Sequence, residues 1–191
     1  STCYRILASL RRFDYVQQRK PGTRYYLGFA HLRFAEAVIE GMDLAAICRP
    51  FLEELHAETD ETTFLAVLSG RNCVTMETCG HVDTRVSVGR GELMPLHASA
   101  AGKAVLAFLP RREQQEIVEH LELPRYTEAT ITDPQALARQ LEEIRSTGVS
   151  YNCEEFHKGI NALATPIFGG LGRVVGAIAA VGISVDLDAA Q

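Results

Sequence analysis

Apolar residues repeat at helical spacing near the start of the chain. Ile6, Leu7 and Leu10 lie on one face of such a helix, and the dipeptide Ser1-Thr2 precedes them as a cap. The pattern predicts one amphipathic helix whose apolar face packs against a core.

Residues typical of β-strands follow in two short runs. The runs cover residues 15–17 and 24–27, and the breaker Lys20-Pro21-Gly22 lies between them. This pattern predicts a two-stranded hairpin with a basic tip. A helix followed by a basic hairpin is the order of elements in the second half of a winged helix.

Helical spacing returns in the next part of the chain. Apolar residues recur from residue 28 to 40, Gly41-Met42-Asp43 interrupts them, and a second helical pattern continues to Thr59. We interpret the two segments as connector helices.

The remaining sequence predicts strands, then helices, then strands again. The expected strands are 62–68, 73–78, roughly 84–88, 149–152, 161–168 and 173–181. The expected helices are 99–108, 110–121 and 133–148. Asp133 as a cap and Pro134 at the first helical position mark the start of the last helix. This order favours an α+β sandwich with a mainly antiparallel sheet.

Charge divides the chain into a basic start and an acidic remainder. Residues 1–33 hold seven Lys/Arg and one Asp, a net charge of +6, whereas the other 158 residues hold 12 Lys/Arg and 23 Asp/Glu, a net charge of −11. A basic end on an acidic body is expected of a protein that presents one end to phosphates. Chance clustering of charge on a solvated face is the alternative.

Composition indicates where the protein works and the redox state of its cysteines. The sequence has no run of 18 apolar residues and opens with no secretory signal, so we expect no membrane contact and a cytoplasmic location. Five scattered cysteines without a CxxC pair favour reduced thiols. A hydrophobic content of 47% over 191 residues is enough for a substantial core.

Three segments carry a family resemblance. They are Ser1-Thr2-Cys3-Tyr4-Arg5-Ile6-Leu7 with the Phe13-Asp14-Tyr15-Val16 and Tyr25-Tyr26-Leu27-Gly28 runs, Met94-Pro95-Leu96-His97-Ala98-Ser99-Ala100-Ala101-Gly102-Lys103-Ala104, and Asn152-Cys153-Glu154-Glu155-Phe156 continuing through Gly159 to Gly182. Together they resemble the IclR family of bacterial transcription regulators over nearly the whole chain. Many winged helices share the first segment, whereas the second and third are more specific.

The resemblance implies an α+β fold in three parts. A partial winged helix-turn-helix would cover residues 1–27, connector helices 28–59, and a GAF-like effector domain with a mainly antiparallel sheet flanked by helices 60–191. It also implies a repressor or activator that binds operator DNA, senses a small organic acid, needs no cofactor and works as a homodimer or homotetramer. Residues that precede the recognition helix in the family are absent from the sequence, so we expect a truncated or partly ordered chain.

The basic start of the chain supplies the candidate DNA contacts. A recognition helix enters the major groove with its N-terminus first, so its first residues face base edges or phosphates. On this helix the expected contacts are Ser1, Thr2, Tyr4 and Arg5. On the hairpin the residues expected to bind backbone phosphate are Arg19, Lys20 and Arg24.

Small residues open the central helix. Ser99 is followed by Ala100, Ala101 and Gly102, and the first N–H groups of a helix have no partners within the helix. Small side chains let a ligand approach those N–H groups, and a helix N-terminus favours an anion. We therefore hypothesise an organic acid whose carboxylate lies on the backbone of Ser99, Ala100 and Ala101. An ordinary buried helix start with small residues for packing is the alternative.

The resemblance extends the effector site to other elements. The further effector-binding residues it implies are Val86, Asn152, Ile160, Ala162, Ala179 and Val181. Ala162, Ala179 and Val181 would form an apolar wall, which favours a larger, more apolar or aromatic acid over glyoxylate-like molecules.

Other chemistry receives less support. His97 with Ser99, or Cys153 with His157, could pair a nucleophile with a base in a small-molecule hydrolase, but no third orienting group accompanies either pair. A stand-alone sensor that acts on a protein partner is another alternative. The candidate zinc ligands are Cys79, His81 and His97, or Cys153 and His157, and because no strong ligand spacing supports either set we expect no metal.

Glu154 and Glu155 are adjacent acids rather than a catalytic pair. Neighbouring side chains of a strand or loop point apart. We interpret the two residues as solvated or as support for the pocket.

Overall fold

The computed structural model describes residues 2–18, 20, 24–31, 43–80, 86–185 and 187. The chain divides into two compact units, Ser1–Leu44 and Ala45–Gln191. No helix in the described part of the chain is long and apolar enough to span a bilayer.

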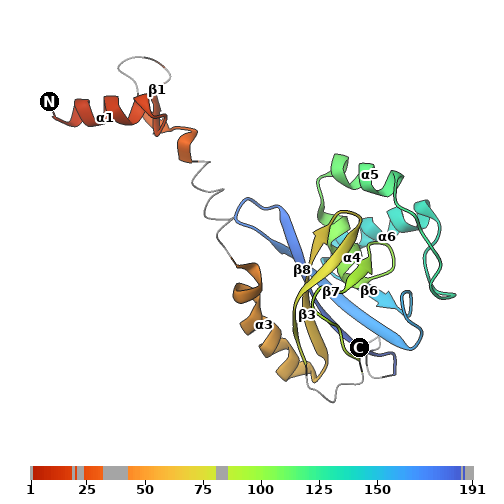
Figure 1. Ribbon diagram of the computed structural model, residues 1–191. Helices are drawn as coiled ribbons and strands as arrows, with labels where there is room; N and C mark the ends of the chain where they lie inside the picture. The colour runs from red at the N-terminus through yellow and green to blue at the C-terminus, as the bar shows by residue number, and fades with distance from the viewer. Residues whose placement is uncertain are drawn as a thin grey trace. The chain divides into compact units, whose positions relative to one another are not determined.

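The described part of the first unit includes a helix followed by a hairpin (Figure 1). Helix α1 (Thr2–Arg12) leads into strands β1 (Val16–Gln18) and β2 (Tyr25–Leu27), which pair antiparallel with Val16 opposite Leu27. The helix and the hairpin predicted from the sequence are therefore confirmed. Most of the helix predicted at 28–40 lies outside the described residues.

Gly28 fastens the end of the hairpin to the turn after α1. A Cβ atom on this residue would lie 1.8 Å from the carbonyl oxygen of Asp14. The Gly28 N–H donates to Tyr15 O at 2.8 Å, and the Ala30 N–H donates to Asp14 O at 3.1 Å. Only glycine permits so close an approach of two backbone segments.

The apolar face of α1 is open. Leu7 and Leu10 are half-buried, but Ile6 is 56% exposed and no residue of this helix is buried. The prediction that Ile6 faces a core is therefore wrong. Within the described part of this unit, two strands of three residues offer too little apolar surface to cover a whole helix face.

The second unit is built on one antiparallel sheet of six strands in the order β5-β4-β3-β8-β7-β6 (Figure 1). The strands are β3 (Thr62–Ser69), β4 (Asn72–Cys79), β5 (Leu93–Pro95), β6 (Ser150–Cys153), β7 (Ile160–Phe168) and β8 (Val174–Ile183). The helices are α3 (Leu44–Thr59), α4 (Ala100–Phe108), α5 (Arg111–Glu119) and α6 (Pro134–Thr147). The predicted α+β class is confirmed.

Helix α4 is the centre of the core. Its residues from Ala100 to Ala107 are all buried, as expected for a helix that is apolar on every side. One side packs on the sheet against inward residues such as Phe64 and Ala177, and another packs against Leu137 and Leu141 of α6. The start of α4 is thereby held at a fixed position over the sheet.

Helix α3 packs on the opposite face of the sheet. Its buried residues Cys48, Leu52 and His56 recur every four positions and form one stripe. Thr63 of β3 donates its hydroxyl to Leu52 O at 2.8 Å. The side chain of Phe64, the next residue, points the other way, because neighbouring strand residues alternate between faces.

A bulge directs Glu77 toward α3. Opposite Leu65 and Ala66 the register of β4 shifts by one residue, so Thr75 pairs with Ala66 but Glu77 pairs with Leu65. Residues directly opposite in a sheet share a face, so Glu77 points outward with Leu65. There its carboxylate forms ion pairs with Arg49 of α3 and with Arg90.

The predicted strand at 84–88 is not observed where it can be checked. Residues 84 and 85 lie outside the described range, and Val86 to Val88 form no strand. The carbonyl of Val86 instead accepts the Thr62 hydroxyl at 2.6 Å. The next strand is β5, which the pattern does not reveal because it has three residues and ends in Pro95, a residue tolerated at a sheet edge.

Candidate functional site

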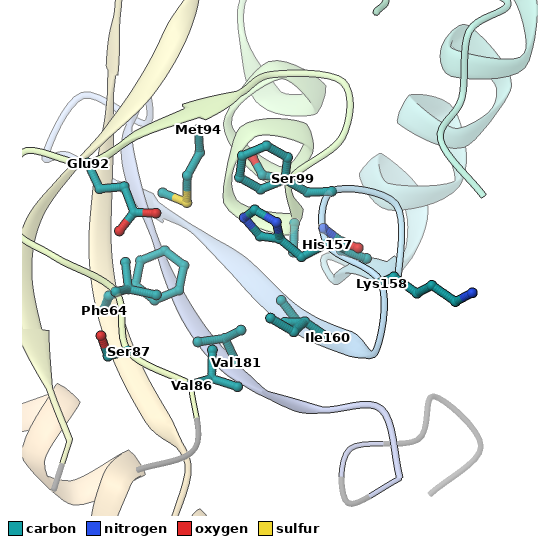
Figure 2. A pocket seen from close by; sticks show the side chains of 15 residues that line it. Phe64, Val86, Ser87, Glu92, Met94, Ser99, His157, Lys158, Ile160 and Val181 are labelled. Carbon is teal, nitrogen blue, oxygen red and sulfur yellow. The ribbon is translucent and has the colours of Figure 1, made fainter. Parts of the chain in front are cut away.

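A cavity of about 470 Å³ lies between the sheet and the start of α4. Strands β3, β7 and β8 contribute residues to it, as do residues 86–88 and the loop between β6 and β7 (Figure 2). The side chains of Phe64, Val181 and Ile160 make part of its wall apolar. The residues that line the cavity are far apart in sequence, from Phe64 of β3 to Val181 of β8.

Ser99 is the N-cap of α4, the helix whose N-terminus lies at this cavity. Its hydroxyl accepts a hydrogen bond from the Gly102 N–H at 3.1 Å and donates one to Pro95 O at 2.7 Å. Its backbone is extended, with φ −114° and ψ 144°, as in a typical N-cap. The helix start predicted at Ser99 is therefore confirmed.

Gly102 leaves room for the Ser99 hydroxyl to cap α4. A Cβ atom at this position would lie 2.6 Å from Ser99 Oγ and 2.7 Å from Leu96 Cα. Any larger residue would displace the turn that precedes the helix. The small residue at this position is thus needed for packing.

The N–H groups at the start of α4 are used differently from our expectation. The Ser99 N–H donates to Pro95 O at 3.2 Å and is not available to a carboxylate. The N–H groups of Ala100 and Ala101 have no acceptor among the residues that the structure describes. Of these two, only Ala100 lines the cavity.

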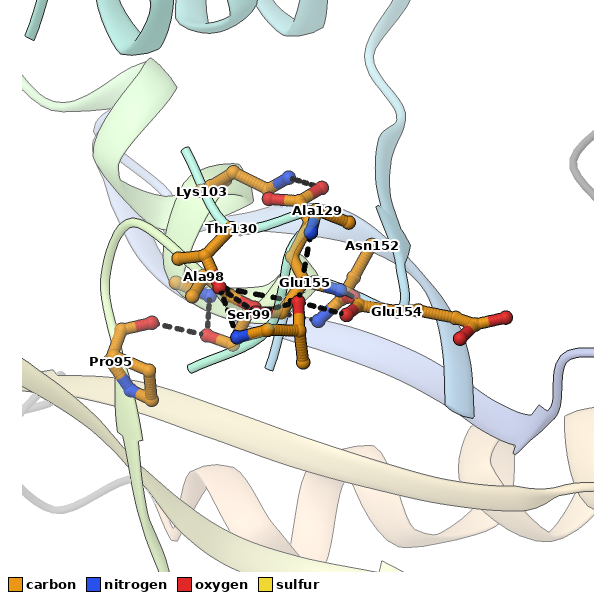
Figure 3. Close-up of polar contacts among 11 residues, drawn as sticks. Pro95, Ala98, Ser99, Lys103, Ala129, Thr130, Asn152, Glu154 and Glu155 are labelled. Carbon is orange, nitrogen blue, oxygen red and sulfur yellow. Dashed lines mark hydrogen bonds and ion pairs between the residues drawn. The ribbon is translucent and has the colours of Figure 1, made fainter. Parts of the chain in front are cut away.

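Asn152 links the segment before α4 to the loop after β6 (Figure 3). Its Nδ2 donates to Ala98 O at 2.6 Å, immediately before the cap, and its Oδ1 accepts from the Glu155 N–H at 2.8 Å. The side chain is buried and lines the cavity. Because both ends of the amide are engaged, the side chain fixes the position of α4 relative to the loop after β6.

Glu155 lies in that loop and binds a lysine of α4. Its Oε1 lies 2.5 Å from Nζ of Lys103, and Lys103 is fully buried. Burial lowers the pKa of Lys103, while the adjacent Glu155 carboxylate opposes this effect and favours the charged ammonium. The Glu155 carbonyl also accepts the Thr130 hydroxyl at 2.6 Å. Glu155 is therefore one of the pocket's supports, as one of our two interpretations holds.

Glu154 points away from its neighbour (Figure 3). Its backbone has φ 57°, and its Oε2 accepts the Gly159 N–H at 2.8 Å. This bond lowers the pKa of the Glu154 carboxyl. The two acids do not act as a pair, and Glu154 closes the loop that leads to β7.

The structure brings most of the predicted effector residues to one cavity. Those that line it are Val86, Ser99, Ala100, Asn152, Ile160, Ala162 and Val181. Ala101 and Ala179 do not line it; both are buried in the core.

Eight lining residues were missing from the prediction. They are Phe64, Ser87, Val88, Glu92, Met94, Phe156, His157 and Lys158. Alternation along β3 could have placed Phe64 on the inward face. The loop residues could not be placed, because their position depends on contacts between distant segments.

The candidate DNA contacts that are described lie at the surface of the first unit. Thr2, Tyr4 and Arg5 are exposed on the first turns of α1, and Lys20 and Arg24 are exposed near the hairpin. The other two candidates, Ser1 and Arg19, lie outside the described residues.

His97 does not activate a nucleophile at Ser99, as the hydrolase interpretation requires. The imidazole donates from Nε2 to Pro124 O at 3.0 Å, and the Ser99 hydroxyl donates to Pro95 O. Burial lowers the pKa of His97. Within the described residues, no three His, Cys, Asp or Glu side chains are grouped to hold a metal; His81 lies outside them.

Comparisons with known proteins agree with this architecture. The family described as bacterial transcriptional regulator IclR C-terminal matches residues 36–190. The HTH-type transcriptional repressor AllR of Klebsiella pneumoniae is 33% identical over 184 residues, which are 95% of this chain and 67% of AllR.

Solved structures show the same fold. The crystal structure of the Thermotoga maritima IclR is 29% identical, with a TM-score of 0.72 over 96% of this chain and 74% of that one. The inducer-binding domain of PobR from Acinetobacter, a double mutant in complex with 3-hydroxybenzoic acid, is 28% identical, with a TM-score of 0.71 over 78% of this chain and 88% of that one.

The fold is that of the sensor domain of a ligand-responsive transcriptional regulator. The chain belongs to the IclR family of bacterial transcriptional regulators, which are not enzymes.

Proposed function

We propose that this regulator binds operator DNA through α1 and its hairpin and senses a small organic acid in the cavity at the start of α4. The observation that carries the second part is the Ala100 N–H, which has no acceptor among the described residues and belongs to a residue of the cavity wall. A free N–H at the positive end of a helix favours a carboxylate.

The size and the walls of the cavity favour an aromatic acid. A volume of about 470 Å³ falls within the range of about 300–1,000 Å³ common for small-molecule sites. Phe64, Met94 and Phe156 offer apolar and aromatic surface to a ring. The 3-hydroxybenzoic acid bound by the PobR domain gives independent support for this class.

In this proposal the chain has three parts. Residues 1–27 are part of a winged helix-turn-helix, 28–59 are connector helices, and 60–191 are the effector domain. The protein works in the cytoplasm as a homodimer or homotetramer. The acid changes the spacing of two recognition helices by binding one arrangement better than the other.

The DNA contacts combine direct and backbone recognition. Ser1, Thr2, Tyr4 and Arg5 face base edges or phosphates, and Arg19, Lys20 and Arg24 bind phosphate. The net charge of +6 over residues 1–33 supports this orientation toward DNA.

Thermal unfolding with benzoate and acetate tests the sensor. Benzoate is expected to raise the melting temperature in a concentration-dependent way, whereas acetate, which leaves the apolar wall uncovered, raises it far less. Ala162→Phe fills the cavity and abolishes the benzoate shift, while the control Ala138→Phe, at an exposed position on α6, preserves it. A shift with acetate alone, or one that survives in the filled cavity, contradicts the proposal.

A further inference from the structure

The cavity has polar groups at two separated ends. Ser99 and His157 lie at one end, whereas Ser87 and Glu92 lie at the other (Figure 2). Asn152, which donates to Ala98 O beside Ser99, belongs to the first end. Figure 2 shows the His157 ring turned into the cavity and Glu92 on the opposite side of it. Apolar side chains separate the two ends.

The Glu92 carboxylate is held in place by a turn attached to β4. Its Oε2 accepts the Gly89 N–H at 2.9 Å, and its backbone carbonyl accepts the Thr75 N–H at 3.0 Å. The Gly91 N–H donates in turn to Thr75 O at 2.8 Å. Among the residues that the structure describes, Oε1 of Glu92 has no partner, so one acceptor oxygen stays available to a ligand.

Within the described ranges, no cation forms an ion pair with this carboxylate. Arg90 is the basic residue closest to Glu92 in the sequence, and its guanidinium forms an ion pair with Glu77 of β4 instead. Lys158 lines the same cavity, but Figure 2 shows its side chain extending away from the centre. The described residues therefore give the end of the cavity at Glu92 a negative charge.

Strand β5 sets the distance between the two ends. Glu92 directly precedes β5, and three residue steps separate its Cα atom from that of Pro95, which is about 10 Å in an extended chain. Pro95 O accepts both the N–H and the hydroxyl of Ser99. A single aromatic ring with a substituent at each side fits a span of this size.

We propose that Glu92 determines effector specificity by accepting a hydrogen bond from a hydroxyl or amino group that lies across the ring from the effector's carboxylate. This inference rests on the proposed function and defines its ligand class further. An ionised carboxylate only accepts hydrogen bonds, so it selects donors. It also repels a second carboxylate on the ligand.

Calorimetric titration of the chain tests this role with benzoate, 3- and 4-hydroxybenzoate, and benzene-1,4-dicarboxylate. At least one hydroxybenzoate is expected to bind roughly tenfold tighter than benzoate, and the dicarboxylate more weakly than benzoate. Glu92→Leu removes the advantage of the hydroxyl but keeps benzoate binding. Glu92→Gln improves the relative binding of the dicarboxylate, because the repelling charge is gone. The control Glu119→Gln, at an exposed position on α5, changes neither preference.

The outcomes separate the two proposals. If benzoate binds but neither hydroxybenzoate binds more tightly, or if Glu92→Leu leaves the preference intact, the role of Glu92 is overturned and the acid sensor stands. If none of the four acids binds, the aromatic-acid sensor and the role of Glu92 are both overturned. Melting temperatures measured without ligand establish that each variant is folded.

Discussion

Lys103 and Glu155 form a buried ion pair, with 2.5 Å between Nζ and Oε1 and at most 7% of either side chain exposed. The pair joins α4 to the loop after β6 across 52 residues of sequence. That loop supplies Phe156 and His157 to the cavity. The ion pair therefore holds together two of the segments that form the proposed sensor site.

Removing only Lys103 leaves a buried carboxylate without its cation. Lys103→Met is expected to lower the free energy of unfolding by about 3–5 kcal/mol, the usual cost of breaking a buried pair. The double variant Lys103→Met with Glu155→Leu removes both charges and recovers part of this loss. Urea denaturation of the wild type, both single variants and the double variant measures the coupling. Strictly additive losses would show that the two charges do not stabilise each other.

Asn152 has a more direct effect on the cavity. Asn152→Ala leaves Ala98 O and the Glu155 N–H without their partners, at about 1–3 kcal/mol for each unsatisfied group. It also frees the start of α4 from the loop, so benzoate affinity is expected to fall by roughly tenfold, about 1.4 kcal/mol.

Asn161→Ala is the matched control for that experiment. It removes a similar bond, from Nδ2 to Leu187 O at 2.6 Å, but Asn161 does not line the cavity. The control is expected to lower stability and leave benzoate affinity unchanged. Equal losses of affinity in both variants would mean that Asn152 acts only through general stability.

Local signals predicted the helices of the second unit well. Ser99 caps α4 through a side-chain bond to Gly102, and Asp133 caps α6 through bonds to Gln135 and Ala136. These signals operate within one helical turn, so the sequence alone contains them. Alternation along a strand is local too, so Phe64 of β3 could have been placed on the inward face, whereas the wall residues Ala162 and Val181 were expected from the family resemblance.

Such local signals could not predict contacts between distant segments. Nothing near Lys103 in the sequence indicates that its partner is Glu155, and an apolar helix with one lysine does not predict a buried charge. The outward direction of Glu77 depends on a bulge in β4. Alternation alone would place Glu77 on the wrong face. The prediction for Ile6 was wrong for a related reason, because a helical pattern shows which face of a helix is apolar but not whether another element covers that face.

Glu77 is expected to make stability depend on pH. Burial by itself would raise its pKa, but the Thr78 N–H and the guanidinium groups of Arg90 and Arg49 outweigh burial and lower the pKa of Glu77. A carboxyl whose pKa is lower in the folded state contributes stability above its unfolded pKa, about 4.3, and loses it as the pH falls through the folded value. The stability difference between wild type and Glu77→Gln should therefore be largest near neutral pH and shrink below about pH 4.

The size of this difference is limited by solvent. Glu77 has 8% of its side chain exposed, but both arginine partners are more than half exposed and are screened. We expect about 1–2 kcal/mol at neutral pH, measured by urea denaturation across a pH series. Glu142→Gln, which breaks the exposed pair with Arg111, is the control and should have a smaller effect. A difference that grows as the pH falls would contradict the assignment.

The DNA contacts can be distinguished by their salt dependence. A lysine that binds only phosphate releases counterions, so Lys20→Ala should weaken binding to all duplexes and reduce the slope of log affinity against log salt by about 0.9. Arg5, near the start of α1, is expected to contact bases, so Arg5→Ala should also lower the preference for a selected operator over random DNA, by about 1–3 kcal/mol. Mobility-shift titrations at several salt concentrations, with an operator selected from a random pool, measure both effects. Arg139→Ala, on the exposed side of α6, is the control and should change neither the slope nor the preference. Unchanged affinity in Arg5→Ala would remove α1 from the proposed DNA interface.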